Sequence, residues 1–241
     1  MVNLNTFHLD TMIWSTVDIA VEFQISKDLL GQGGFRKAYR AKSNTQEFSN
    51  VECVVKKRKT SVLKDIEAIN QTVEQHTRKV VQMRHLAWNV AAQLTQVVLD
   101  QDLRDLFGET FSYKTIYLAK LPDGEFVTVE EFVEGKMEKL VNNDGTPCWN
   151  KEDVTLQKAE CLVHFSYEKS NYQVMLVDVQ GACYELFDPE IASAELLDSQ
   201  NEVLFTTGNL SAMLLKTLKS TTYVIFIAEV CHWSHFQVKQ N

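Results

Sequence analysis

Stretches in which apolar and polar residues alternate recur in the part of the chain before residue 133. Alternation with a period of two is typical of strands that bury one face, and these stretches are rich in β-branched and aromatic residues. We expect strands at 21–26, 35–41, 51–57, 115–119 and 126–132. A Pro-Asp-Gly sequence predicts a turn between the last two. Together these strands are expected to form the first of two lobes.

A helix with one apolar face is expected between the third and fourth of these strands. From Val80 to Val97 the apolar residues recur at spacings of three and four. This spacing places them on one side of a helix of several turns, which we expect to pack on the sheet.

The second half of the chain predicts three further elements. A helix is expected at 154–161, and another begins after Gly208. Between them, the segments 173–178 and 182–187 are expected to form a hairpin with Gly181 at its turn.

Composition and charge narrow the class of protein. A chain of 241 residues can form one domain or two lobes around a cleft. Its hydrophobic content of 45% is ordinary for a globular protein, and the sequence contains no low-complexity tract. The formal net charge of −8 argues against a long phosphate-neutralising face, so nucleic acid is a poor candidate for the partner. A basic or neutral partner suits this charge better.

The cysteines and the ends of the chain bear on its location. The five cysteines form no C-x-x-C pair, and the N-terminus lacks a basic flank followed by a long apolar segment. These features predict a reduced, cytoplasmic protein. The apolar run at 223–230 is far shorter than the ~20 residues that span a bilayer, so no membrane anchor is expected.

A glycine cluster and a strand lysine are the first candidates for chemistry. Gly31, Gly33 and Gly34 would let the backbone approach phosphate oxygens, although such clusters are more often plain hairpin turns. Lys56 follows at a distance that allows one antiparallel strand to return, as in nucleotide sites where a strand lysine contacts phosphates. Glu67 and Glu74 are the two candidates for the carboxylate partner of Lys56.

Two carboxylates and a carboxamide form the most informative constellation. Asp178 and Gln180 follow an apolar run, and Asp188 stands shortly after them before a proline. Phosphoryl transfer needs a carboxylate that orients or deprotonates the hydroxyl, and a metal that neutralises phosphate charge. We expect Asp178 to serve as the base, and Gln180 with Asp188 to hold Mg²⁺ through hard oxygen ligands.

These motifs, in this order, resemble the atypical protein kinases called alpha-kinases, such as the myosin heavy chain kinases and elongation factor 2 kinase. The matching segments are 31–39, 54–57, 132–136, 164–167 and 178–181. The resemblance implies an α+β, bilobal fold with ATP in the cleft between the lobes. It also implies an N-terminal extension at 1–19 and a kinase domain at 20–241, divided into lobes at 20–133 and 134–241.

The resemblance also implies roles for single residues. Arg36 would lie near the nucleotide phosphates, Lys56 would be the ATP lysine, and Glu130 would lie beside the adenine. Glu134 and Lys139 would help to shape the cleft.

A structural zinc site is the point at which the chain departs from the family. His164 matches the first family ligand, but Thr222, Tyr223 and the residues after them replace the His-x-Cys-x-x-x-Cys cluster. Zinc is therefore doubtful, with a replacement site formed by Cys231, His232 and His235 as the alternative.

Three hypotheses about function follow. The first is an ATP- and Mg²⁺-dependent protein serine/threonine kinase that acts on a protein substrate. The second is a pseudokinase or nucleotide-binding scaffold with an incomplete zinc site. The third is an interaction module that does not use nucleotide, and nucleotide binding separates this module from the other two.

Overall fold

The computed structural model describes residues 1–193 and 196. The predicted helix after Gly208 and the candidate zinc ligands Cys231, His232 and His235 lie outside the described residues.

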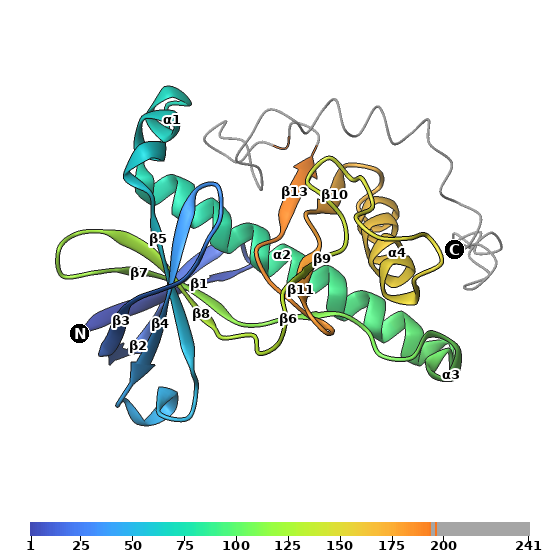
Figure 1. The fold of residues 1–241 in the computed structure, drawn as a ribbon, viewed down its shortest axis with the longest axis horizontal. Helices are drawn as coiled ribbons and strands as arrows, with labels where there is room; N and C mark the ends of the chain where they lie inside the picture. The colour runs from blue at the N-terminus through green and yellow to red at the C-terminus, as the bar shows by residue number, and fades with distance from the viewer. Residues whose placement is uncertain (194–195, 197–241) are drawn as a thin grey trace.

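The first lobe is built on a seven-stranded antiparallel sheet (Figure 1). In spatial order its strands are β2 (Ile13–Val21), β1 (Val2–His8), β7 (Ile116–Lys120), β8 (Phe126–Glu131), β5 (Cys53–Arg58), β4 (Arg36–Ser43) and β3 (Phe23–Gln32). All five predicted strands are present, and the central strands β5 and β8 are buried along most of their length. Short 3-10 turns, η1 (Gln46–Phe48) and η2 (Thr60–Val62), flank β5.

Residues 2–21 are part of this sheet and do not form a separate extension. β1 pairs with both β2 and β7, and Leu4 and Phe7 are almost fully buried. The kinase domain was predicted to start at residue 20 because no motif precedes that position. The first lobe instead begins with β1, since these apolar side chains complete its core.

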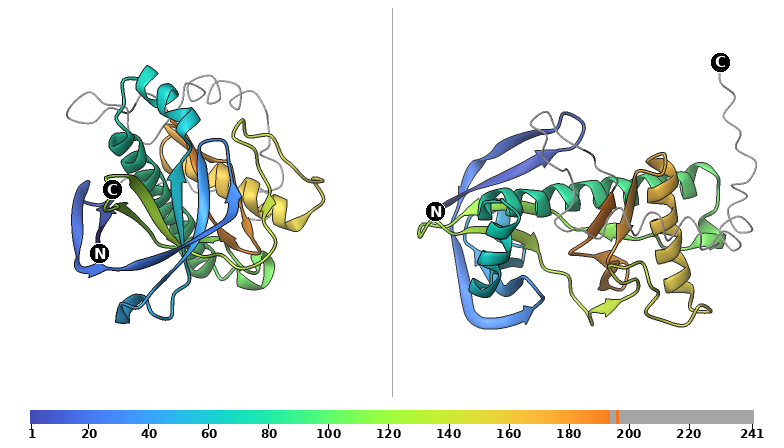
Figure 2. Two further views of the ribbon diagram at one scale, coloured as in Figure 1. Left: turned by 60° about the vertical axis from the view of Figure 1, so that its left-hand side comes forward. Right: turned by 90° about the horizontal axis from the view of Figure 1, so that it is seen from above.

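A long helix, α2 (Val73–Asp100), connects the two lobes (Figure 2). Its start at Val73, ahead of the predicted Val80, is set by a capping box in which Thr72 and Gln75 exchange side-chain and backbone hydrogen bonds. Val81 packs in the sheet-side core, whereas Ala87 and Leu94 pack in the core of the second lobe. One rigid element therefore sets the position of both lobes. The helices α1 (Leu63–Ala68) and α3 (Arg104–Phe107) flank it.

The second lobe combines α4 (Val154–Lys169) with two small sheets. One sheet pairs β10 (Val174–Val177) with β13 (Glu190–Ser193). The other has the order β6 (Ser112–Tyr113), β12 (Glu185–Leu186), β11 (Gln180–Ala182) and β9 (Glu138–Lys139). The described helices include none that is long and apolar enough to cross a lipid bilayer.

The predicted hairpin with Gly181 at its turn is wrong. β10 pairs with β13, and Gly181 lies inside β11, between its neighbours β12 and β9. A Cβ atom added at Gly181 would lie 2.1 Å from the carbonyl oxygen of Glu185. The glycine is therefore required by the close approach of a neighbouring strand and not by a turn.

The helix predicted at 154–161 continues to Lys169 and so includes His164. Asp153 caps its start by accepting hydrogen bonds from the backbone of Thr155 and Leu156. His164, which matches the first zinc ligand of the family, lies in this helix with its Nδ1 3.7 Å from Oε2 of Glu168.

The close strand contact at Gly181 makes a testable prediction. Gly181→Ala should lower the free energy of unfolding by about 2 kcal/mol or more, because the new methyl group would overlap backbone atoms that cannot rotate away. Gly33→Ala is the matched control, since a Cβ atom there meets no atom within 4 Å. Urea unfolding of both variants that gave equal stabilities would contradict this account.

Candidate active site

A cavity of about 550 Å³ lies between the seven-stranded sheet and the second lobe. Its volume is in the range of about 300–1,000 Å³ that is typical of small-molecule sites. Its walls come from the glycine segment at 31–34, the strand β5, the connection at 130–137 and the segment from Asp178 to Glu190. The residues predicted to bind nucleotide or Mg²⁺ meet here, whereas the zinc candidate His164 does not line the cavity and Cys231, His232 and His235 lie outside the described residues.

The glycines at 31, 33 and 34 line the cavity, and the protein's own packing does not require them. None of the three has a positive φ, and a Cβ atom at each would have no neighbour within 4 Å. A plain hairpin turn, the alternative interpretation of this cluster, therefore does not explain why glycine occupies all three positions. Their small size leaves the backbone open to a ligand, as phosphate-binding loops require.

Lys56 forms a buried ion pair with Glu130, which is 2% exposed. The distance from Nζ to Oε2 is 2.9 Å, and the hydroxyl of Thr128 donates to the other carboxylate oxygen of Glu130. Neither Glu67 nor Glu74, the partners considered from the sequence, takes this place. The carboxylate comes from the neighbouring strand because Thr128 is opposite Lys56 in the ladder and Glu130 is the diagonal neighbour.

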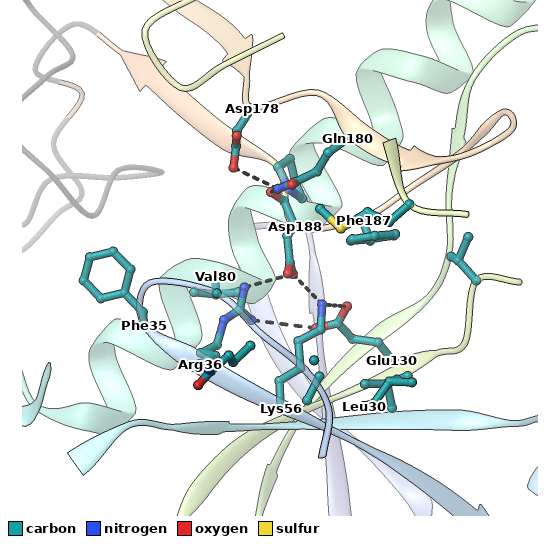
Figure 3. Close-up of a pocket in the computed structure, with 18 of the residues that line it drawn as sticks. Leu30, Phe35, Arg36, Lys56, Val80, Glu130, Asp178, Gln180, Phe187 and Asp188 are labelled. Atoms are coloured by element: carbon teal, nitrogen blue, oxygen red, sulfur yellow. Dashed lines mark hydrogen bonds and ion pairs between the residues drawn. The ribbon is translucent and has the colours of Figure 1, made fainter. Parts of the chain in front are cut away.

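Asp188 bridges the two cations of the first lobe (Figure 3). Its Oδ1 lies 2.6 Å from Nζ of Lys56 and 2.9 Å from Nη2 of Arg36. Burial would raise the pKa of Asp188, but the charges of Arg36 and Lys56 outweigh burial and hold that pKa well below its usual range. Asp188 is therefore an anion at neutral pH.

Asp178 faces the same cavity from the end of β10. Its Oδ1 lies 2.5 Å from Nζ of Lys139, and its Oδ2 accepts a hydrogen bond of 2.9 Å from Nε2 of Gln180. Burial raises the pKa of Asp178 above its ordinary value, and the Lys139 ammonium only partly offsets this. A carboxylate with a raised pKa is a better proton acceptor than an exposed aspartate.

Asp178 and Asp188 both have a left-handed backbone conformation, with φ values of 54° and 50°. This conformation is uncommon for residues other than glycine and tends to occur where function requires a special geometry. It turns the chain sharply at both aspartates, so that carboxylates from two different segments point into one cavity (Figure 3).

The oxygen atoms of Gln180 and Asp188 fit a hard cation such as Mg²⁺. The Gln180 amide nitrogen donates to Asp178 and to the backbone carbonyl of Asp188, which directs the amide oxygen away from these acceptors. Only Oδ1 of Asp188 is used by Lys56 and Arg36. The described residues contain no cluster of three or more His, Cys, Asp or Glu side chains that could cage a metal alone. Mg²⁺ commonly completes its coordination with water and substrate phosphates.

Several predictions about neighbouring residues had mixed outcomes. Lys139 does contact the site, through Asp178, whereas Glu134 is exposed and does not line the cavity. Arg58 and His76 also line the cavity, although neither was predicted as a site residue. Arg58 could have been found from the alternation of β5, because residues 54, 56 and 58 share one face.

Comparisons with known proteins agree with this geometry. The profile of the alpha-kinase family matches residues 31–212, which is more than half of the chain. Alpha-protein kinase 1 of Dictyostelium discoideum is 38% identical over 108 residues, which cover 45% of this chain and 7% of that kinase. The chain thus spans a small fraction of that relative.

Solved structures show the same fold. The alpha-kinase domain of myosin-II heavy chain kinase A in complex with AMP-PNP superimposes with a TM-score of 0.69 at 16% identity, covering 89% of this chain and 88% of that one. A second structure of that domain, which contains a phosphorylated aspartate, gives 0.73 at 16% identity and covers 96% and 95%. The predicted α+β kinase fold is confirmed, and the chain belongs to the alpha-kinase family.

Proposed function

We propose that the chain is an ATP-dependent protein serine/threonine kinase, which transfers the γ-phosphate of Mg-ATP to a protein hydroxyl. The observation that carries the proposal is the meeting of Lys56, Asp178, Gln180 and Asp188 around one cavity. The AMP-PNP complex of the related kinase domain supports a nucleotide as the occupant. The cysteine pattern supports a cytoplasmic location.

The residues of the first lobe would bind the nucleotide. Lys56, oriented by Glu130, and Arg36 would hold phosphate oxygens through charge-assisted hydrogen bonds. The backbone at Gly33 and Gly34 would cover the phosphates, since no side chain obstructs it. The resemblance implied that Glu130 lies beside the adenine. The ion pair of Glu130 with Lys56 instead supports a role in orienting that lysine.

The residues of the second lobe would carry out the transfer. Asp178 would orient the substrate hydroxyl and accept its proton, as the bond from that oxygen to Pγ forms and the bond from Pγ to the leaving ADP oxygen breaks. Gln180 and Asp188 would hold Mg²⁺, which neutralises phosphate charge when bound. Lys139 and Gln180 keep the Asp178 carboxylate in place.

A pseudokinase or nucleotide-binding scaffold is the second candidate function. The observation that favours it is the loss of the His-x-Cys-x-x-x-Cys cluster from the sequence. Among the described residues, His164 has no set of potential ligands around it. The transfer assay with Asp178 variants separates the two candidates.

Removal of the Lys56 ammonium should weaken nucleotide binding. We expect Lys56→Met to lower ATP affinity about ten- to hundredfold, because it removes a charge-assisted contact. Since this leaves Glu130 buried with one cation fewer, the double variant Lys56→Met/Glu130→Gln tests the same contact without the unpaired charge. Lys57→Met is the control, because Lys57 pairs with Glu125 on the other face of β5. Unchanged affinity in calorimetry would refute the assignment of Lys56.

Asp178 should be needed for transfer but not for nucleotide binding. Asp178→Asn keeps the size of the side chain and removes the proton acceptor, so transfer of ³²P to a basic protein should fall by about 100-fold or more. Mg-ATP affinity should stay within about twofold of the wild type. A variant that transfers phosphate at the normal rate would exclude Asp178 as the base, and a wild type without transfer would favour the scaffold.

Asp188 should govern the dependence of ATP binding on magnesium. Its carboxylate competes with phosphate for Lys56 and Arg36, unless a cation draws it away from them. Asp188→Asn should therefore strengthen binding of metal-free ATP and abolish the further gain from Mg²⁺. Titration of ATP with EDTA or with Mg²⁺ measures both effects. If the variant kept the wild-type response to Mg²⁺, Asp188 would not be a metal ligand.

A further inference from the structure

One end of the cavity contains two buried side chains that the proposed transfer does not use. Arg58, the last residue of β5, is 9% exposed, and His76, in the first turns of α2, is 4% exposed. Both line the cavity together with Phe35, whose ring centre lies 6.2 Å from that of His76. Strand, helix and glycine segment therefore converge at this end.

The strand geometry places Arg58 beyond the proposed phosphate contact of Lys56. Val54, Lys56 and Arg58 lie on the same face of β5, and all three line the cavity. The strand rises about 6.8 Å over two residues, so Arg58 is that much farther along than Lys56. The opposite end of β5, at Cys53, pairs with Glu131 near the connection between the lobes. Arg58 therefore lies at the end away from that connection.

Arg58 has no carboxylate partner within the described residues. Its Nη2 lies 3.4 Å from the hydroxyl of Thr77, and its Nε has no hydrogen-bond partner. Directly across the ladder stands Arg36, another cation. Like charges in opposite positions destabilise a sheet, and burial together with Arg36 lowers the pKa of Arg58 to about 9.

Arg58 is a buried positive charge without a paired carboxylate in the described part of the chain. Arg36 and Lys56 are compensated by Glu130 and Asp188, whereas Arg58 forms an ion pair with none of the described carboxylates, Glu190 of the cavity wall included. Burial of an uncompensated guanidinium costs free energy, which an anionic ligand can repay.

His76 is a second unsatisfied group beside Arg58. Its Nδ1 is buried and has no partner among the residues the structure describes. Burial, followed by the charges of Arg58 and Arg36, lowers the pKa of His76 to about 4. The ring is thus neutral at pH 7 and can donate one hydrogen bond to an anion from the tautomer protonated at Nδ1.

We propose that Arg58 and His76 form a second oxyanion site, which binds a phosphate group farther along the cavity than the phosphates held by Lys56. A planar guanidinium beside an unpaired imidazole suits a tetrahedral oxyanion. The phosphate is either the terminal group of the nucleotide or a phosphate outside it. The position relative to a nucleotide rests on the proposed kinase function, whereas the anion site itself does not.

The test measures binding of inorganic phosphate to the full chain by ³¹P NMR, with and without saturating ADP. Arg58→Met should weaken phosphate binding about tenfold or more, and Arg58→Lys should restore part of it. Lys57→Met, on the opposite face of β5, should behave as the wild type. His76→Phe keeps the ring packing against Phe35 and should weaken binding by a smaller factor.

The source of the phosphate is distinguished by affinities for ATP and ADP. If phosphate binds to the ADP complex and Arg58→Met abolishes this, the site takes a phosphate outside the nucleotide. If instead Arg58→Met lowers affinity for ATP but not for ADP, the site takes the terminal phosphate. If Arg58→Met changes neither phosphate binding nor the ratio of the two affinities, the proposal is overturned.

Thermal unfolding separates this site from the fold and from the kinase function. Arg58→Met should keep or raise the Tm in phosphate-free buffer, because it removes an uncompensated buried cation. It should lose the rise in Tm that phosphate causes in the wild type. Both measurements are made without nucleotide, so failure of the transfer assay would leave them intact. Equal phosphate-induced rises in Tm for wild type and variant would contradict the site.

Discussion

The arrangement of the cavity depends on the need to neutralise charge that has been taken out of water. Glu130 is almost completely buried, and an unpaired carboxylate there would be too costly to keep ionised. Lys56 and Arg36 supply the positive charge, and Asp188 shares both cations through one oxygen. Because Asp188 belongs to the second lobe, these ion pairs hold the two lobes together across the cavity.

The long helix α2 fixes the relative position of the two lobes that supply these charged side chains. It contributes Val81 to the sheet-side core and Leu94 to the other core, so neither lobe can shift along it without loss of packing. Between these positions Arg84 is buried, with its Nε donating to the carbonyl of Lys114 and its guanidinium 5.0 Å from the ring centre of Tyr113. The helix thereby holds the chain that enters β7.

Local pattern was a good guide to the elements and a poor guide to their partners. Alternation and β-branched composition marked the five predicted strands of the first lobe, and the spacing of apolar residues marked most of α2. The strands β1 and β2 were not predicted. The buried residues of β1 are Val2, Leu4 and Phe7, whose spacings of two and then three depart from strict alternation. The pairing of β10 with β13 could not be read from adjacent residues, since a segment of the other sheet lies between them.

The sequence by itself determined which residue types are present at the spacing of a phosphoryl-transfer site, and it identified the family to which the chain belongs. Tertiary structure alone decided that Glu130, and not Glu67 or Glu74, pairs with Lys56. It also decided that a neighbouring strand lies too close to Gly181 for any side chain there, and that Arg58 is buried beside His76. The physical reason is range. Propensity and periodicity act between residues a few positions apart, whereas ion pairing, close backbone contact and burial depend on segments that only folding brings together.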